Sequence, residues 1–411
     1  MAERTDRIRT THVGSLPRPE QLIELTHRRV VGEAVEEATL AGELGACVAD
    51  VVRRQKEVGV DLVNDGEFGH TMGYAYDFGS WISYVLSRLD GVEVDEQELW
   101  ERPMSMHPGV AEPGEFALGT FRDRRDWTRF SEAYADPHSG CALPEQYLSS
   151  RSPVVRGPLT YSGHDVLQRD IDNLKAALDA AGIEDGWMNA VGPASCSRFT
   201  NEYYGSDEEL LYACAEAMRE EYKAIIDAGL VLQLDDPAIA DNWDQAKDEP
   251  TVEAYTRYTM PRIEALNHAI RGLPPDRIRF HLCWGSWHGP HSTDLPMADL
   301  ARVMLAVNAD YYSFEAANVR HEHEWRVWHE VKLSEGKKIL PGVVSHATNV
   351  IEHPQVVADR IIRFAEAVGR ENVIASTDCG LGGRVHPQIA WAKLKTLAEG
   401  AALASKELWG H

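Results

Sequence analysis

The chain has 411 residues, 44% of them hydrophobic, so it is long enough to bury a large core as one big domain or two ordinary ones. Its formal net charge is −24, from 65 acidic and 41 basic residues, which argues against nucleic acid or an anionic membrane surface as the main partner. The amino-terminal stretch is polar, no apolar run approaches the roughly 20 residues of a membrane span, and the cysteines are few, so we expect a cytoplasmic protein without a disulfide scaffold.

Regular structure is predicted at the start of the chain and then lost. Residues 10–19 read as a short strand that runs into a Gly/Pro break, and residues 34–58 carry the apolar spacing of a helix. Residues 60–67 read as a second strand that ends in a polar turn. Residues 72–150 show no regular order and are too long for a plain loop, so we interpret them as an insertion or lid.

From residue 153 onward, extended and helical segments alternate. Extended segments are predicted at 153–161, 186–193, 230–237, 278–283, 309–315, 339–346 and 373–379, with helices at 166–181, 207–228, 251–270, 295–308, 323–333, 354–368 and 387–404. Such alternation predicts βαβ units and a parallel sheet. Counting eight or nine strands, we predict an α/β fold, a (β/α)8 TIM barrel over 1–411 with an insertion after the second strand. The segment 153–161 would lie outside the barrel, and a doubly wound sheet also fits the pattern.

A metal-ligand pattern lies at the end of the strand 278–283. His281 and Cys283 are two residues apart, so on a strand they point the same way, at the end where parallel-sheet enzymes keep their chemistry. An imidazole with a thiolate is a zinc-type ligand set. Two further candidate ligands, Glu315 and Cys379, also follow strand-like runs. Together the four residues predict a zinc site.

Other polar residues also fall at predicted strand ends: Ser15, Glu67, Arg198, Asp235, Asp236, His346 and Asp378. Burying a carboxylate there is costly unless it meets a cation, a metal or a hydrogen-bonding substrate, so the set predicts a functional site. Structural roles are open for two of them, because Glu67 suits a helix cap and Asp236 a turn with Pro237. The histidines of the next loops lack ligand spacing, and we interpret them as surface or loop residues: His288, His291, His321 and His323.

In this order, the motifs resemble the catalytic barrel of the cobalamin-independent methionine synthase family, in the short single-barrel form that includes epoxyalkane:coenzyme M transferase. Residues 10–17 are similar to the family's thiol-substrate loop, and residues 65–67 and 232–237 to its two acidic strand ends. The resemblance implies a set of zinc ligands and a proton-donor histidine: His281, Cys283, Glu315 and Cys379 for the zinc, and His346 for the proton.

The resemblance also implies a mechanism. Zinc holds the acceptor thiol as a thiolate, the thiolate attacks an electrophilic carbon, and an acid protonates the leaving atom. Ser15, Glu67 and Asp235 would hold the amino acid end of the acceptor, and Asp236 or His346 would be the acid. Glu315 would be a displaceable fourth ligand. Where the family has a tryptophan that stacks on the pterin, this chain has Arg198, which suits a ring, a carboxylate or a sulfonate.

Three functions remain open at this stage. The first is zinc-dependent methyl transfer to homocysteine, as in methionine biosynthesis, from a folate, cobalamin-bound or other donor. The second is thiol addition to another carbon, such as epoxide opening by coenzyme M, or the reverse carbon–sulfur cleavage, with Arg18 or Arg198 facing the anionic tail of the thiol. The third is a non-catalytic barrel with structural zinc or none. The first two imply a small thiol acceptor and an alkyl donor, and a homo-oligomer is left open.

Overall fold

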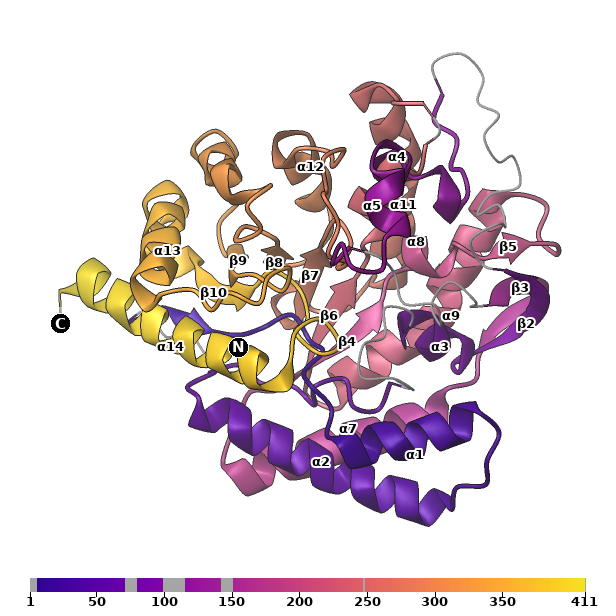
Figure 1. The fold of residues 1–411 in the computed structure, drawn as a ribbon, viewed down its shortest axis with the longest axis horizontal. Coiled ribbons are helices and arrows are strands. Elements are labelled where there is room, and N and C mark those ends of the chain that lie inside the picture. The colour runs from indigo at the N-terminus through magenta and orange to yellow at the C-terminus, as the bar shows by residue number, and fades with distance from the viewer. Residues whose placement is uncertain (1–5, 71–79, 99–114, 142–150, 247, 411) are drawn as a thin grey trace.

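A parallel sheet forms the centre of the fold (Figure 1). The computed structural model describes residues 6–70, 80–98, 115–141, 151–246 and 248–410. Seven strands pair in the order β1-β10-β9-β8-β7-β6-β4: β1 (Arg9–Thr10), β4 (Trp187–Val191), β6 (Val231–Asp235), β7 (Ile278–Leu282), β8 (Tyr311–Phe314), β9 (Lys338–Val344) and β10 (Ile374–Thr377). The predicted α/β fold with a parallel sheet is confirmed, and the carboxyl ends of these strands gather at one edge.

One short segment lies between the two outermost strands of this sheet. The Leu62 N–H donates to the Thr10 carbonyl of β1 at 3.0 Å, and the Trp187 N–H of β4 donates to the Val63 carbonyl at 3.1 Å. Residues 60–67 therefore make one isolated bridge, Val63 with Gly186, in place of the predicted strand. The chain turns immediately afterwards, because the Asn64 side chain accepts the N–H of Gly66 at 2.8 Å. The closed eight-stranded barrel stays a prediction.

Helices follow most of the strands: α1 (Glu20–Val30), α2 (Glu37–Glu57), α7 (His164–Ala181), α8 (Pro193–Cys196), α9 (Asp207–Asp227), α10 (Ala238–Asp241), α11 (Val252–Ala269), α12 (Met297–Met304), α13 (Pro354–Val368) and α14 (Pro387–Trp409). Helix α9 begins with the usual signals of a helix start, because the Ser206 hydroxyl accepts the Glu209 N–H and the first turn is acidic.

Helix α1 was not predicted, because only Leu22 and Thr26 of its residues are buried. The predicted helix 323–333 is instead the 3₁₀ helix η5 (Glu322–His329). Its first turn closes with a three-residue bond from the Glu324 N–H to the His321 carbonyl.

A second, three-stranded sheet lies beside the first. It has the order β2-β3-β5 and comprises β2 (Leu89–Glu98), β3 (Arg151–Tyr161) and β5 (Thr200–Asn201). The prediction that 153–161 lies outside the main sheet is thus confirmed. None of the helices in the described ranges is long and apolar enough to span a membrane.

The predicted insertion contains ordered elements where it is described. Besides β2, these are α3 (Ser80–Leu86), η2 (Phe121–Asp123), α4 (Arg125–Arg129) and α5 (Ser131–Ala135), so the expected loss of order is wrong for these parts. The rest of 72–150 lies outside the described residues. We call residues 119–135 the cap segment. It contacts η3 (Asn242–Gln245), where the Gly119 N–H donates to the Gln245 carbonyl at 2.9 Å.

Candidate metal and substrate site

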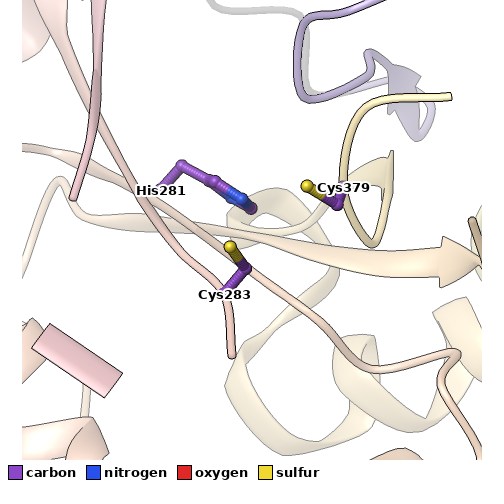
Figure 2. Close-up of side chains that lie close together, drawn as sticks. All are labelled: His281, Cys283 and Cys379. Atoms are coloured by element: carbon purple, nitrogen blue, oxygen red, sulfur yellow. The ribbon is translucent and has the colours of Figure 1, made fainter. Parts of the chain in front are cut away.

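Three side chains from two strand ends meet at the carboxyl edge of the sheet. His281 lies in β7, Cys283 directly follows it, and Cys379 follows β10. Their ligand atoms all lie within 4.8 Å of one another, and Figure 2 shows the ring and both sulfurs directed toward a common point. The structure thus brings these three residues together, and their role as zinc ligands stays a prediction. They are called the metal triad below.

The chemistry of the triad fits zinc. One imidazole and two thiols are the soft donor set that zinc prefers, and three protein ligands leave room for a fourth from outside. His281 Nε2 is buried and has no hydrogen-bond partner among the described residues, while its Nδ1 lies 3.2 Å from the Ser313 hydroxyl. An orphaned buried nitrogen aimed at two sulfurs is explained by a bound cation.

The protonation of the triad supports this interpretation. The hydrogen bond from Cys283 holds the pKa of the Cys379 thiol well below its usual value, and the same bond, with burial, raises the pKa of Cys283. Burial lowers the pKa of His281, but the neighbouring Cys379 thiolate outweighs it and leaves that pKa raised. His281 and Cys283 therefore hold their protons next to the Cys379 thiolate, and a bound cation would replace these protons.

Glu315 belongs to a different group behind the triad. Its ligand atoms gather with those of His346 and Asp378, again within 4.8 Å. Its carboxylate accepts the Trp284 N–H at 3.1 Å and the Asn318 side-chain amide at 3.2 Å, and burial raises its pKa to about 7. The role of Glu315 as a fourth ligand stays a prediction.

His346 is fully buried, with neither ring nitrogen bonded to a described residue, and burial lowers its pKa to about 3. Asp378 directly precedes Cys379, and its Oδ1 accepts the N–H groups of Ala316 and Ala317, both at 2.8 Å. Asp378 thus ties the end of β10 to the end of β8, a role that the sequence alone did not reveal.

Two carboxylates share one amide close to the triad. Asn189 Nδ2 donates to Glu67 Oε1 at 2.7 Å and to Asp235 Oδ2 at 3.0 Å, while Gln233 donates to Asp235 Oδ1 at 2.9 Å. Burial, with the charge of Asp235 nearby, raises the pKa of Glu67 to about 8, and burial raises that of Asp235 to about 6. Two buried acids held side by side by one amide, each with a raised pKa, form a site suited to an ammonium group. Asn189 was not predicted, although a polar residue inside a buried strand is a signal for it.

Gly14 leaves the space that Glu67 occupies. Its φ is +147°, and a Cβ added there would lie 2.0 Å from Glu67 Oε1. We expect Gly14→Ala to lower the free energy of unfolding by about 1–3 kcal/mol, because the acid must move and the backbone is strained. Gly42→Ala is the control, since that helical glycine has open space and should gain up to about 1 kcal/mol. Thermal unfolding of both variants measures this, and an equal response would contradict the clash.

A cavity of about 210 Å³ joins the triad and the acid pair. It brings together seven of the predicted site residues: Ser15, Glu67, Arg198, Asp235, His281, Cys283 and Cys379. Glu315, His346 and Asp236 are not among the residues that line it. The Asp236 carboxylate accepts the N–H groups of Ala194 and Ser195, at 3.2 and 2.8 Å, and the Ser195 hydroxyl at 2.7 Å. It therefore anchors the start of α8 beneath the cavity.

The outer wall of the cavity comes partly from the cap segment, through Phe121, Arg124 and Trp127. Trp287, from the loop after β7, completes the aromatic part of this wall. The sequence predicts an insertion or lid over residues 72–150 but does not identify these residues, because no regular pattern places them.

Two of the four histidines expected to be surface or loop residues lie in loops but are buried, so the surface alternative is wrong for them. His291 and His321 are 3% and 2% exposed, whereas His323 is exposed. Asp294 Oδ2 lies 3.0 Å from a ring nitrogen of each, and the rings of Trp284 and His321 stack with centroids 3.8 Å apart. The sequence pattern failed here because it does not show that both histidines lie at hydrogen-bonding distance from one buried carboxylate, that of Asp294.

Asp294→Asn should destabilise the protein by about 3 kcal/mol, because it leaves the buried imidazolium of His291 without its paired carboxylate and leaves that of His321 with Glu324 alone. Although burial lowers both values, Asp294 raises the pKa of His291 to about 9 and, with Glu324, that of His321 to about 10. The stability that these histidines contribute is therefore complete below about pH 6.5 and is lost as the pH rises through 9 to 10. Thermal unfolding between pH 7 and pH 10, about the range of the two transitions, should show a flatter dependence in the variant. The exposed Asp299→Asn is the control and should behave as the wild type.

Comparison with known proteins agrees with this geometry. Residues 150–402 match the family described as the catalytic domain of cobalamin-independent synthase. The chain is 23% identical to a methionine synthase of Thermococcus kodakarensis, over 97% of this chain and 94% of that protein. It is also 23% identical to a methionine synthase of Sulfolobus acidocaldarius, over 97% of this chain and 93% of that one.

Two solved structures share the fold. A B12-independent methionine synthase from Shewanella sp. W3-18-1, in complex with selenomethionine, is 20% identical with a TM-score of 0.70, covering 98% of this chain and 100% of that chain. A putative vitamin-B12 independent methionine synthase from Listeria monocytogenes is also 20% identical, with a TM-score of 0.62 and the same coverage of both chains. At this identity the likeness concerns the fold.

Proposed function

The chain belongs to the cobalamin-independent synthase family, by its catalytic domain, and from this premise we propose that it transfers a methyl group to the thiol of homocysteine. The observation that carries the proposal is the metal triad beside the Glu67–Asp235 pair in one cavity. A thiol bound at the triad with its ammonium group at the two acids matches an amino acid thiol. The methionine synthase relatives support the same substrate.

His281, Cys283 and Cys379 would hold a zinc ion. A zinc ion there would lower the pKa of an incoming thiol, so that its thiolate is available at neutral pH. Glu67 and Asp235 would pair with the ammonium group of the acceptor, and Asn189 keeps the two carboxylates aligned before it arrives. The acceptor's ammonium would also return the raised pKa of Glu67 toward its ordinary value.

The remaining residues have supporting roles in the proposal. Ser15 and Arg198 would contact the substrates from the cavity wall. His346 would supply a proton only once the bound substrates raise its pKa, which burial lowers to about 3 in their absence; its ring nitrogens have no hydrogen-bond partner in the described part of the chain. Asp236 would act through α8 by fixing the wall that carries Ser195. Glu315 would approach the cation only when no thiol is bound.

We further propose that residues 61–63 close the sheet into a (β/α)8 barrel, because they hydrogen-bond to β1 on one side and to β4 on the other. The barrel would make residues 1–411 one cytoplasmic domain with the insertion at its mouth.

Addition of a thiol to a different electrophile, such as an epoxide, is the second candidate. Arg198 lines the cavity and would face an anionic thiol such as coenzyme M. Arg18 is less suited, because it does not line the cavity and its guanidinium donates to the Glu67 and His70 carbonyls.

The two candidates differ in the thiol that they consume. We expect zinc-dependent consumption of homocysteine with a methyl donor such as methyltetrahydrofolate or methylcobalamin, and none of coenzyme M with an epoxide. Both reactions are followed with a thiol reagent, with chelated protein as the control. Consumption of coenzyme M alone would favour the second candidate. Activity with neither thiol, together with a metal that added thiols do not perturb, would favour a structural zinc.

A further inference from the structure

The cavity has two chemically different ends. The inner end carries the metal triad and the two acids Glu67 and Asp235. The outer end carries two arginines and one acid, Arg124, Arg198 and Asp241, among aromatic side chains. An ammonium group suits the first end, whereas the second offers an excess of positive charge.

One carboxylate joins these two arginines. Asp241 Oδ1 lies 2.6 Å from Arg124 Nη2, and Asp241 Oδ2 lies 2.6 Å from Arg198 Nη2. The three side chains are 5% exposed or less. Asp244 lies 3.6 Å from Arg124 but does not line the cavity, and its other oxygen accepts the Thr293 hydroxyl. Two buried guanidinium groups in the wall thus share a single carboxylate within the cavity.

Arg198 retains a donor for a further partner. Its Nε is buried and has no hydrogen-bond partner among the residues that the structure describes. An unsatisfied buried donor on a charged group costs free energy unless a ligand accepts from it. An anionic oxygen is the acceptor that a guanidinium binds best, often through two parallel bonds.

Aromatic rings lie against both guanidinium groups. The Arg124 guanidinium carbon is 4.4 Å from the centre of the Trp287 ring, and that of Arg198 is 5.4 Å from the centre of Phe121. A guanidinium stacked on a ring keeps its edge available for hydrogen bonds. Trp127 adds another apolar face to the same wall. The wall therefore suits a flat unsaturated group next to an anionic one.

The cap segment that carries Arg124 is tied to the rest of the wall. Asp126 Oδ1 accepts the N–H and the hydroxyl of Ser292, at 2.9 and 2.8 Å, and its Oδ2 accepts the Tyr134 hydroxyl at 3.0 Å. Tyr134 in turn accepts the indole N–H of Trp287 at 2.9 Å. This segment precedes residues 150–402, which match the family description, so it is a feature of this chain beyond that match.

We propose that Arg124 and Arg198 form a subsite for an anionic group on the alkyl donor, and that the cap segment, through Arg124, determines which donors are accepted. The inference rests on the proposed function only in identifying the bound molecule as the donor. Its chemical class is a small unsaturated molecule carrying a carboxylate, sulfonate or phosphate next to the flat part.

A matched pair of probes tests this without turnover. We would measure binding of 1-naphthalenesulfonate and of its neutral analogue 1-naphthyl methyl sulfone to the zinc-loaded full chain by quenching of tryptophan fluorescence. The sulfonate is expected to bind about tenfold more tightly than the sulfone, because only it can pair with the guanidinium groups. Equal binding of the two probes by the wild-type protein would overturn the proposal, whatever the variants do.

Variants of the cap segment test whether Arg124 supplies the positive charge that binds the sulfonate. Arg124→Gln should weaken sulfonate binding about tenfold and leave sulfone binding within about twofold. Arg129→Gln is the matched control, because it removes the same charge from an exposed position of the cap segment and should change neither. Arg124→Lys should restore part of the sulfonate preference. Equal weakening of both probes by Arg124→Gln would mean that Arg124 acts only by packing, which would also overturn the proposal.

The result of the probe-binding experiment can be distinguished from the result of a test of the proposed function. A preference for the sulfonate in a protein that methylates no thiol would leave the subsite standing and reject the reaction. Methyl transfer to homocysteine by a protein with equal affinity for both probes would do the reverse.

Discussion

Replacing Cys379 by serine should remove the bound metal and the activity together. The serine hydroxyl is a poor ligand for a soft cation, and only two triad ligands would remain. Wild-type protein purified from zinc-containing medium should hold about one zinc per chain, as expected for a catalytic site with three protein ligands. Both Cys379→Ser and Cys283→Ser should hold little and should consume no homocysteine. Elemental analysis and thiol consumption on the same samples provide the measurement.

The control for this experiment is Cys141→Ser, the same chemical change at a cysteine that does not line the cavity. It should keep both metal and activity. Equal zinc content in the wild type and in both triad variants would refute the metal assignment. Loss of zinc with full retention of activity would instead separate the metal from the reaction.

The second large effect is expected at Asp235. Removing one partner of a buried charge pair costs about 2–5 kcal/mol, so Asp235→Asn should raise KM for homocysteine about a hundredfold. The zinc content should not change, because Asp235 is not a member of the triad. A thiol without an ammonium group, such as 3-mercaptopropionate, should not bind more weakly to the variant than to the wild type. This difference between the two thiols identifies the group that Asp235 recognises.

Asp236→Asn is the matched control, at the neighbouring position and with the same loss of charge. Because the Asp236 carboxylate accepts hydrogen bonds from the start of α8 and does not line the cavity, the variant should lose stability without a selective change in KM for homocysteine. Parallel increases in KM for both thiols at Asp235→Asn would argue for general distortion. A fall in kcat at Asp236→Asn with unchanged stability would instead support the acid role predicted from the sequence.

The sequence could indicate which residues of the inner end of the cavity come together, because its signals are local. His281 and Cys283 point the same way by the two-residue repeat, Asp235 ends β6, which pairs with β7, and Cys379 follows β10 of the same parallel sheet. Those rules fix which side chains gather at the carboxyl edge. They do not fix distance, which is why Glu315 lies with His346 and Asp378, outside the triad.

These rules could not predict the contacts at the outer end of the cavity. Arg124 and Trp287 meet through cap-segment contacts that depend on tertiary packing and not on periodicity. The burial of His291 and His321 has the same origin, since Asp294 lies near both rings only after the loop has folded. Arg198 was identified, but its link to Asp241 could not be, because β5, helix α9 and β6 separate the two residues along the chain.

The pairing of β1 with β10 has a consequence for how the protein matures. Arg9 and Ile374 are partners in the sheet, so the first strand has no neighbour on that side until nearly the whole chain has left the ribosome. Cys379 follows the same late strand. Metal capture by the triad would therefore follow the synthesis of β10, and until then the nascent chain would carry Cys283 as a solvent-accessible thiol that is open to oxidation. Cells that load this protein efficiently would need zinc to be available after β10 has been synthesised.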